Sequence, residues 1–292
     1  MTKQLPWLVV GQGALGSLMA VQLARQNQSV QLKLRQSQRV TIAYEQSSHS
    51  FTGTIGINCP SLIFAAVKAY QVAPLLDEFR QQPLFDQSQL ILSYNGMLSN
   101  EAEQLRPQDW HWVTTHGAYR DGNQVVHGGH GESWLGGMAG QTTPPAFFSQ
   151  LEQALPPLHF SSDINLRRWY KLAVNCLINP YTVIHQCRNG ELPERVAPAE
   201  WRQVADEIVQ LAAARGRQLD AEDLLAQARR VIAQTAANRS SMLQDYRLQR
   251  PLELDYLNGF VVTASAAEGM VAPANQLLCE RIKAMQATRD PQ

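Results

Sequence analysis

Three polar side chains recur every four residues in an otherwise apolar stretch, WYKLAVNCLINP, at residues 169–180. They are Lys171, Asn175 and Asn179, and a step of four residues along an α-helix advances only about 40° around its axis. All three therefore share one narrow helix face. Burying such groups without partners would cost roughly 2 to 7 kcal/mol for each neutral one. The stripe must face either water or a ligand.

A second candidate for chemistry is GQGALG, residues 11–16, which directly follows the apolar run WLVV and opens an amphipathic helix. In this context Gly11 makes a tight turn, Gly13 lets the backbone approach a pyrophosphate, and Gly16 lets the helix and strand pack closely. The helix start, at Ala14 and Leu15, then binds phosphates through its N–H groups. An incidental glycine-rich turn is the weaker alternative.

The residue about 20 positions further on separates NAD sites from NADP sites, because an acid there binds the ribose hydroxyl of NAD. This chain has Arg35 at that place, and no acid lies between Gln31 and Tyr44. A guanidinium can hold a 2′-phosphate through bidentate hydrogen bonds. The sequence predicts NADP(H). Lys33, on the same strand face, is equally well interpreted as a solvated side chain.

The elements that must position these residues change in character along the chain. The first half alternates strand-like runs with helical ones, which is typical of a parallel sheet built from βαβ units. The strand-like runs are 7–10, 29–34, 62–67, 89–94 and 110–115. From about residue 161 only helical periodicity remains. We expect an α/β fold with domains at 1–163 and 164–292, the second all-helical and its first helix capped by Ser161, Ser162 or Asp163.

Composition argues against several classes of binding partner. Lys plus Arg and Asp plus Glu both number 25, so no net basic field favours nucleic acid or an anionic membrane. No apolar run approaches the roughly 18 residues of a membrane span. The scattered cysteines indicate structural thiols in a cytoplasmic protein. His127 and His130 in HGGHG are interpreted as part of a glycine-rich turn between strands, and we expect no metal.

Together these motifs resemble the ketopantoate reductase (2-dehydropantoate 2-reductase) family. The resemblance runs in order from residue 7 to about 275, through GQGALG, VKAYQV, YNGM, TTHGAYRDGN, KLAVNCLINP, NGEL, SSMLQD and ELDYLNGF. It implies a Rossmann-type domain followed by a helical domain, with the ligand cleft between them. It also implies NADPH-dependent reduction of 2-dehydropantoate to (R)-pantoate, a step toward pantothenate and coenzyme A. Tyr94 departs from the family pattern near the nicotinamide, and the segment between Thr41 and Asn58 matches weakly.

Site residues follow from matching the family motifs position by position. The resemblance implies a catalytic lysine at Lys171 and an acid at Glu253. Substrate-binding positions match Asn95, Asn175, Asn179, Ser241 and, less firmly, Asn189, while Lys68 and Asn95 match positions near the nicotinamide. A protonated lysine can neutralise charge on a ketone oxygen and donate a proton to it. With an unperturbed pKa of about 10.4, Lys171 would be charged at pH 7, and Glu253 would favour that state further.

Each assignment has a structural alternative. Lys171 can be a surface lysine, and Asn179 can cap carbonyls that Pro180 leaves free. Ser241 fits an N-cap with Gln244, whereas Glu253 suits a helix start after Pro251. Lys68 can be solvated, and Asn95 can serve a turn with Gly96.

Two functional alternatives also remain. One is a related NADP-dependent reductase of another 2-oxo or 3-hydroxy acid, and the other is a catalytically silent NADPH-binding sensor. The partner we expect is the small-molecule substrate, with the chain a monomer or homodimer.

Overall fold

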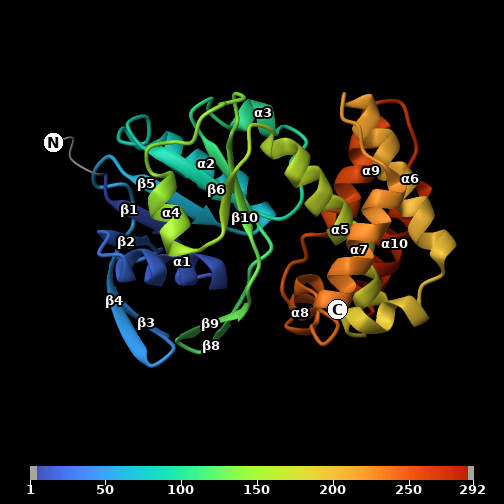
Figure 1. The fold of residues 1–292 in the computed structure, drawn as a ribbon, viewed down its shortest axis with the longest axis horizontal. Helices are drawn as coiled ribbons and strands as arrows, with labels where there is room; N and C mark the ends of the chain where they lie inside the picture. Colours follow the sequence, from blue (N-terminus) through green and yellow to red (C-terminus); the bar gives the residue numbers. More distant parts are fainter. Residues whose placement is uncertain (1–4, 289–292) are drawn as a thin grey trace. The chain divides into compact units, whose positions relative to one another are not determined.

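The computed structural model describes residues 5–288, which divide into two compact units. The first unit holds the residues up to Tyr94 together with Ala102–Arg167. The second unit holds Asn95–Glu101 and the chain from Arg168 onward. The short segment 95–101 leaves the first unit directly after a strand and returns to it, so the YNGM motif contributes Asn95 to the helical unit. Figure 1 shows the chain coloured along its sequence.

The first unit is built on one sheet of eleven strands in the order β11-β10-β7-β6-β5-β1-β2-β4-β3-β9-β8. Its parallel centre pairs β7, β6, β5, β1 and β2 in turn, and β4 continues it in parallel beside β2. These strands are β1 (Trp7–Val10), β2 (Val30–Lys33), β4 (Ser47–Thr54), β5 (Leu62–Ala66), β6 (Gln89–Ser93) and β7 (Trp110–Thr114). Five of them, all but β4, were predicted from the sequence, because short apolar runs between helical segments are a strong local signal.

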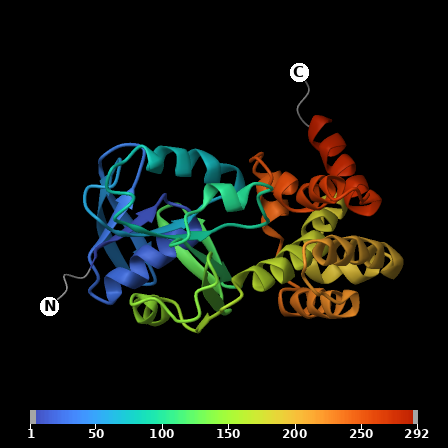
Figure 2. The same ribbon diagram turned by 90° about the horizontal axis from the view of Figure 1, so that it is seen from above.

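Helices cover both faces of this sheet. In Figure 2, α2 (Val72–Arg80) lies on one side, and α1 (Ala14–Arg25) and α4 (Phe148–Ala154) lie on the other. Burial on both faces explains why β1 is buried at every position and shows no polar alternation. Two shorter elements complete this part of the chain, the single-turn helix η1 (Ala69–Gln71) before α2 and α3 (Glu101–Gln104) after β6.

The sequence did not predict the outer strands of the sheet. They are β3 (Arg39–Tyr44), β8 (Gly117–Asp121), β9 (Gln124–Gly129), β10 (Ser133–Gly137) and β11 (Leu158–Phe160). β3 pairs with β4 and β8 with β9, both antiparallel. Such hairpins carry polar residues on an exposed face, so their apolar pattern is short and weak. The predicted turn at HGGHG is partly wrong, because β9 includes the motif through Gly129 and only its last residues lead to β10.

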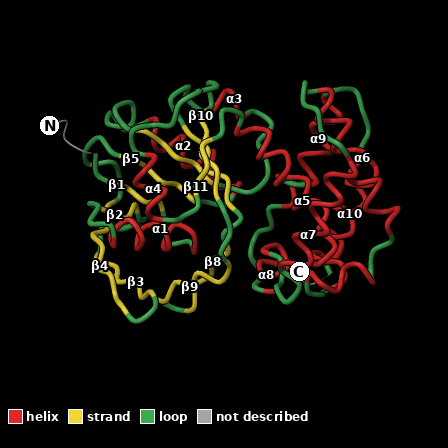
Figure 3. The backbone as a smooth tube through the Cα atoms, viewed as in Figure 1, coloured by secondary structure: helices red, strands yellow, loops and turns green. Residues whose placement is uncertain are grey.

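The described residues of the second unit form helices joined by loops, with no strand among them, as predicted for this part of the chain, and Figure 3 shows the helices in red. The long helix α5 (Ile164–His185) begins at the end of the first unit and belongs to the second from Arg168 onward. It starts after Asp163, whose Oδ1 accepts a hydrogen bond from Leu166 N at 3.2 Å, so Asp163 is the N-cap. The other helices are α6 (Pro198–Ala214), α7 (Ala221–Gln234), α8 (Ser241–Arg247), α9 (Asn258–Ala267) and α10 (Pro273–Ala287), with short turns η2 (Asn189–Glu194) and η3 (Leu254–Tyr256).

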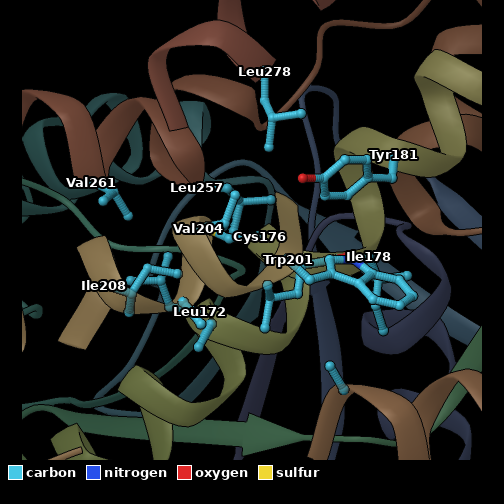
Figure 4. Packing of buried hydrophobic residues seen from close by; sticks show 14 of the residues in the cluster. Leu172, Cys176, Ile178, Tyr181, Trp201, Val204, Ile208, Leu257, Val261 and Leu278 are labelled. Atoms are coloured by element: carbon cyan, nitrogen blue, oxygen red, sulfur yellow. The ribbon is translucent and has the colours of Figure 1, made fainter. Parts of the chain in front are cut away.

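The core of the second unit forms where α5 is enclosed by its neighbours. Figure 4 shows Leu172, Cys176 and Tyr181 of α5 among side chains of α6, α9 and α10. The Tyr181 and Trp201 rings meet edge to face, with centroids 6.4 Å apart and an interplanar angle of 83°. Because one side of α5 is packed so completely, its polar stripe must lie outside this core.

Candidate functional site

The glycine loop has the geometry expected for a phosphate-binding turn. Gly11 has φ of +76°, which an L-residue adopts only with strain, and its N–H donates to Lys33 O at 3.0 Å. A Cβ on Gly16 would lie 3.4 Å from Val10 O, so α1 and β1 pack closely there. No side chain caps the start of α1, and its first turn carries no acid. Its N–H groups and positive dipole end are therefore suited to an anion.

Arg120 supports this loop and was missed by sequence reasoning. From β8, its guanidinium donates to Gln12 O at 3.0 Å and to Gly122 O at 3.0 Å. The arginine and the loop are 108 residues apart, so no local pattern connects them. This hydrogen bond to the carbonyl of Gln12 fixes the part of the loop between Gly11 and Gly13.

The residues predicted to select the cofactor have different surroundings. Arg35 is exposed just beyond the end of β2. Lys33 is not a solvated side chain, because it forms an ion pair with Glu78 at 2.8 Å and keeps only 10% of its side-chain surface exposed. Of the two cations, Lys33 is thus already paired with a carboxylate, whereas Arg35 is the more accessible one for a phosphate.

Lys68 follows β5 in the same unit and stands immediately before η1. Its backbone N–H donates to Gln71 Oε1 at 3.1 Å, and the residue is partly buried. Gly13 approaches the end of the same strand, since a Cβ there would lie 3.7 Å from Ala66 O. The segment that carries Lys68 therefore leaves its strand beside the glycine loop.

In the second unit, α5 carries the stripe of Lys171, Asn175 and Asn179. Lys171 and Asn175 are partly buried, and Asn179 is buried with 6% of its surface exposed. Burial lowers the pKa of Lys171 to about 8, and the nearby Glu253 carboxylate opposes this shift. The expectation that Lys171 keeps its ordinary pKa or has it raised by Glu253 is therefore wrong, because desolvation outweighs the attraction of Glu253. At neutral pH the ammonium form still predominates.

Asn95 and Glu253 meet directly although 158 residues separate them. The Asn95 amide donates to Glu253 Oε2 at 3.3 Å, and Glu253 is buried with 5% exposed. Gly96 has φ of +80° and packs against the backbone of Tyr256, leaving no room for a Cβ, while Met97 N donates to Tyr256 O at 2.9 Å. Asn95 thus serves a turn, as the structural alternative held, and also contacts the predicted acid.

The remaining predicted residues separate into different environments. Ser241 is exposed at the first position of α8, and the N-cap is Ser240, whose Oγ accepts from Leu243 N at 3.0 Å. The N-cap interpretation of Ser241 is wrong by one residue. Asn189 is buried and donates to Thr235 Oγ1 at 2.8 Å, so its amide nitrogen links η2 to the end of α7.

Two other features lie apart from these residues. An open pocket of about 320 Å³ in the first unit is lined by Glu132, Trp134, His159, Phe160, Ser161 and Arg167, and includes none of the predicted site residues. His127 contacts two further histidines: its Nε2 lies 3.0 Å from His116 Nδ1, and its ring lies tilted against that of His130, with centroids 4.2 Å apart. Within residues 5–288, no group of three or more histidine, cysteine or acidic side chains is arranged to hold a metal ion.

The fold and the glycine loop define a protein class, that of oxidoreductases with a Rossmann-type unit and a separate helical unit. Family models described as "Ketopantoate reductase PanE/ApbA" and "Ketopantoate reductase PanE/ApbA C terminal" match residues 7–140 and 163–286. The 2-dehydropantoate 2-reductase of Shigella flexneri is 34% identical over 94% of this chain and 93% of its own. That of Vibrio cholerae is 34% identical over 96% and 97%. The chain belongs to the ketopantoate reductase family.

Solved structures agree on the fold. A D-mandelate dehydrogenase bound to NADH superposes with a TM-score of 0.85 at 19% identity, covering 98% of this chain and all of the other. A PanE/ApbA family ketopantoate reductase from Ralstonia eutropha JMP134 gives 0.81 at 22% identity, covering 97% and 98%. The dimeric ketopantoate reductase of Staphylococcus aureus gives 0.78 at 18%, covering 98% and 100%. Within the described chain, no helix is both long and apolar enough to cross a membrane.

Proposed function

We propose that this protein reduces 2-dehydropantoate to (R)-pantoate with NADPH, in pantothenate and coenzyme A biosynthesis. The observation that supports this most is the placement of Lys171 beside Glu253, with Asn95 bonded to the same carboxylate. A helix stripe alone would not require a buried acid from a distant segment. Family membership indicates the substrate, and Lys171 beside the buried Glu253 carboxylate supplies an acid that can protonate the ketone oxygen.

The cofactor supplies a hydride at the nicotinamide and is held by the first unit in this proposal. Gly11 makes the turn, Gly13 lets the backbone approach the phosphates, and Gly16 lets α1 pack closely on β1, while the N–H groups from Ala14 and Leu15 bind the phosphates. Arg35 pairs with the 2′-phosphate, and Lys68, together with Asn95 of the second unit, matches the family positions for the nicotinamide. Arg120 contributes by holding the loop through Gln12 O.

The second unit holds the substrate and moves the proton. Lys171 donates a proton from Nζ to the ketone oxygen as negative charge develops there. Its lowered pKa makes it a stronger acid than an exposed lysine. Asn175, Asn179 and Ser241 hydrogen-bond the substrate without adding charge. Glu253 keeps Lys171 protonated, and Asn189 keeps its place as a weaker candidate because its amide nitrogen already binds Thr235.

We propose a cytoplasmic enzyme with a small-molecule substrate, no nucleic-acid or membrane partner, and a monomeric or homodimeric state. The balance of 25 basic against 25 acidic residues supports the absence of nucleic-acid binding. The dimer described for the Staphylococcus aureus relative supports a homodimer.

The reaction is tested by following NADPH absorbance with ketopantoate and a panel of other 2-oxo acids. We expect wild type to turn over ketopantoate, and Lys171→Ala to lose at least about 100-fold in kcat while binding NADPH normally, since general acid catalysis contributes roughly 10²- to 10⁴-fold. Folded, NADPH-binding wild type without turnover of any 2-oxo acid would support a silent sensor. Preference for another 2-oxo acid would replace the substrate.

The cofactor assignment is tested with Arg35→Asp. A charged hydrogen bond is worth about 1.5 to 3 kcal/mol, so NADPH affinity should fall roughly 10- to 100-fold while NADH affinity changes little. Lys33→Met is the matched control, because Lys33 already pairs with Glu78. Equal losses for both cofactors in Arg35→Asp would contradict phosphate recognition by Arg35.

A further inference from the structure

The stripe lies on α5, a helix whose ladder of backbone hydrogen bonds is interrupted by Pro180. In α5 the carbonyl of Cys176 would normally accept from the N–H of the residue four positions on. That residue is Pro180, which has no N–H. Cys176 is fully buried, so its carbonyl cannot turn to water and needs another donor.

Side chains of two other helices donate hydrogen bonds to carbonyl groups in this part of α5. Asn258, the first residue of α9, donates from Nδ2 to Cys176 O at 3.4 Å. Trp201 of α6 donates from Nε1 to the next carbonyl, Leu177 O, at 2.8 Å. Figure 4 shows Cys176 and Trp201 in the core that these helices enclose. The sequence alternative in which Asn179 caps the carbonyls freed by Pro180 is therefore wrong, because Asn258 does so.

Asn258 is itself held in one orientation. Its Nδ2 also donates to Asn275 Oδ1 at 2.9 Å, and Asn275 Nδ2 donates to Glu207 Oε2 at 2.7 Å. Glu207 in turn accepts from the backbone N–H groups of Ala274 at 2.7 Å and Asn275 at 3.0 Å, at the start of α10. Asn258 and Asn275 have no exposed surface. The amide that faces Cys176 O is thus fixed by a chain of bonds across α6, α9 and α10.

The hydrogen bond from Asn258 to Cys176 O lies close in sequence to the residues proposed for the reaction. Cys176 lies on the packed side of the same helix, directly after Asn175 and five residues after Lys171 in the sequence. Asn258 lies five residues after Glu253, on the other side of the short turn η3. We propose that Asn258 is a positioning residue, which through Cys176 O sets the placement of Glu253 and of the stripe on α5 relative to each other. This inference rests on the proposed function, in which both groups act on one substrate.

The proline provides a sharp test, because Pro180→Ala restores an N–H to the helix and gives Cys176 O a local partner. In the Pro180 background, we expect Asn258→Ala to lower kcat/KM for the 2-oxo acid about 10-fold, mainly by raising KM. The dissociation constant of NADPH should change less than about 2-fold, because the glycine loop is in the other unit. In the Pro180→Ala background, the same Asn258→Ala change should lower kcat/KM less than about 2-fold.

A second readout does not depend on turnover. Titration of the Lys171 side chain by NMR should give a pKa near 8 in wild type, an altered pKa in Asn258→Ala, and a return toward about 8 when Pro180→Ala is added. Asp220→Ala is the matched control, because it removes an N-cap that accepts from Asp223 N at 3.0 Å and lowers stability elsewhere in the same unit. The control should leave KM and the pKa of Lys171 unchanged.

The outcomes separate the positioning role from simple packing. Equal losses from Asn258→Ala in both backgrounds would overturn the proposal, as would a fall in stability with unchanged KM and unchanged Lys171 titration. If Asn258→Ala does not fold, Asn258→Ser is compared in the same two backgrounds. If ketopantoate is not a substrate, the 2-oxo acid found in the panel replaces it, and the NMR titration reports on Asn258 even if no substrate is found.

Discussion

Lys171 illustrates how a single residue gains its chemistry from surroundings that sequence cannot supply. The spacing of the stripe and the family motif both indicate the residue, but neither contains the desolvation that lowers its pKa to about 8. No local pattern connects Glu253 with Lys171, since the two residues lie on different segments, and only the family resemblance indicated the acid. Burial and the carboxylate act in opposite directions on the same proton, and the result is an acid near physiological pH.

The first prediction concerns the pH dependence of the reaction. A general acid must be protonated, so kcat/KM should be level below pH 8 and fall above it, approaching tenfold for each pH unit. Glu253 raises the pKa of Lys171, so Glu253→Gln should move this fall to lower pH. Steady-state rates from pH 5.5 to 10 measure the break, at about half-unit steps.

Glu280→Gln is the matched control for that profile, because it removes an exposed carboxylate from the same unit. It should leave the break in place. A break that moves to higher pH in Glu253→Gln, or does not move, would contradict electrostatic support of Lys171 by Glu253.

At the scale of elements, the pairing of β8 with β9 brings His116 beside His127, which the sequence placed only in a glycine-rich turn. His116 Nδ1 accepts from Gly131 N at 3.1 Å and lies 3.0 Å from His127 Nε2, so that atom has no room for a proton. Burial, with His127 and His130 adding repulsion, lowers the pKa of His116 to about 4. The pairing of outer strands decided this environment, because their polar residues carry no strong periodic signal.

The second prediction follows from that histidine. The ordinary pKa is 6.5, so between pH 6.5 and about 4 the unfolded chain binds a proton that folded His116 does not. The contribution of neutral His116 to the free energy of unfolding should therefore be fully present above pH 6.5 and should be lost progressively as the pH falls toward 4. Urea unfolding followed at several pH values measures this, and His116→Gln should flatten part of the dependence. His49→Gln, on β4, is the control, and an equally flattened curve there would argue against His116.

Across the whole molecule, the two units divide the work in the proposed reaction. The cofactor loop lies in the first unit, and Lys171, Glu253 and Asn95 lie in the second. Asn95 belongs to the second unit because the short segment 95–101, after β6, is part of that unit. A single boundary in the sequence at 163/164 would place Asn95 in the first unit. Binding of the cofactor and proton donation should consequently respond to different substitutions.

The third prediction uses this division. NADPH at a hundred times its dissociation constant should stabilise the folded protein by about 2.7 kcal/mol, in wild type and in Lys171→Ala alike. Gly11→Ala should gain less from the same NADPH concentration, because φ of +76° strains alanine at the phosphate-binding turn. Denaturant unfolding with and without NADPH gives these differences. A loss of the NADPH effect in Lys171→Ala would mean that the lysine, and not the loop alone, holds the cofactor.

The sequence by itself determined the central strands, the glycine loop, the helical second unit and the residues of the stripe, because each depends on spacing over a few residues or on a family motif. The tertiary structure decided which of these residues meet and in what electrostatic setting. Arg120 reaches Gln12 across 108 residues, and Asn258 reaches the carbonyl of Cys176 across 82. Such contacts leave no local pattern, since they are made only when separate elements pack and exclude water from the groups between them.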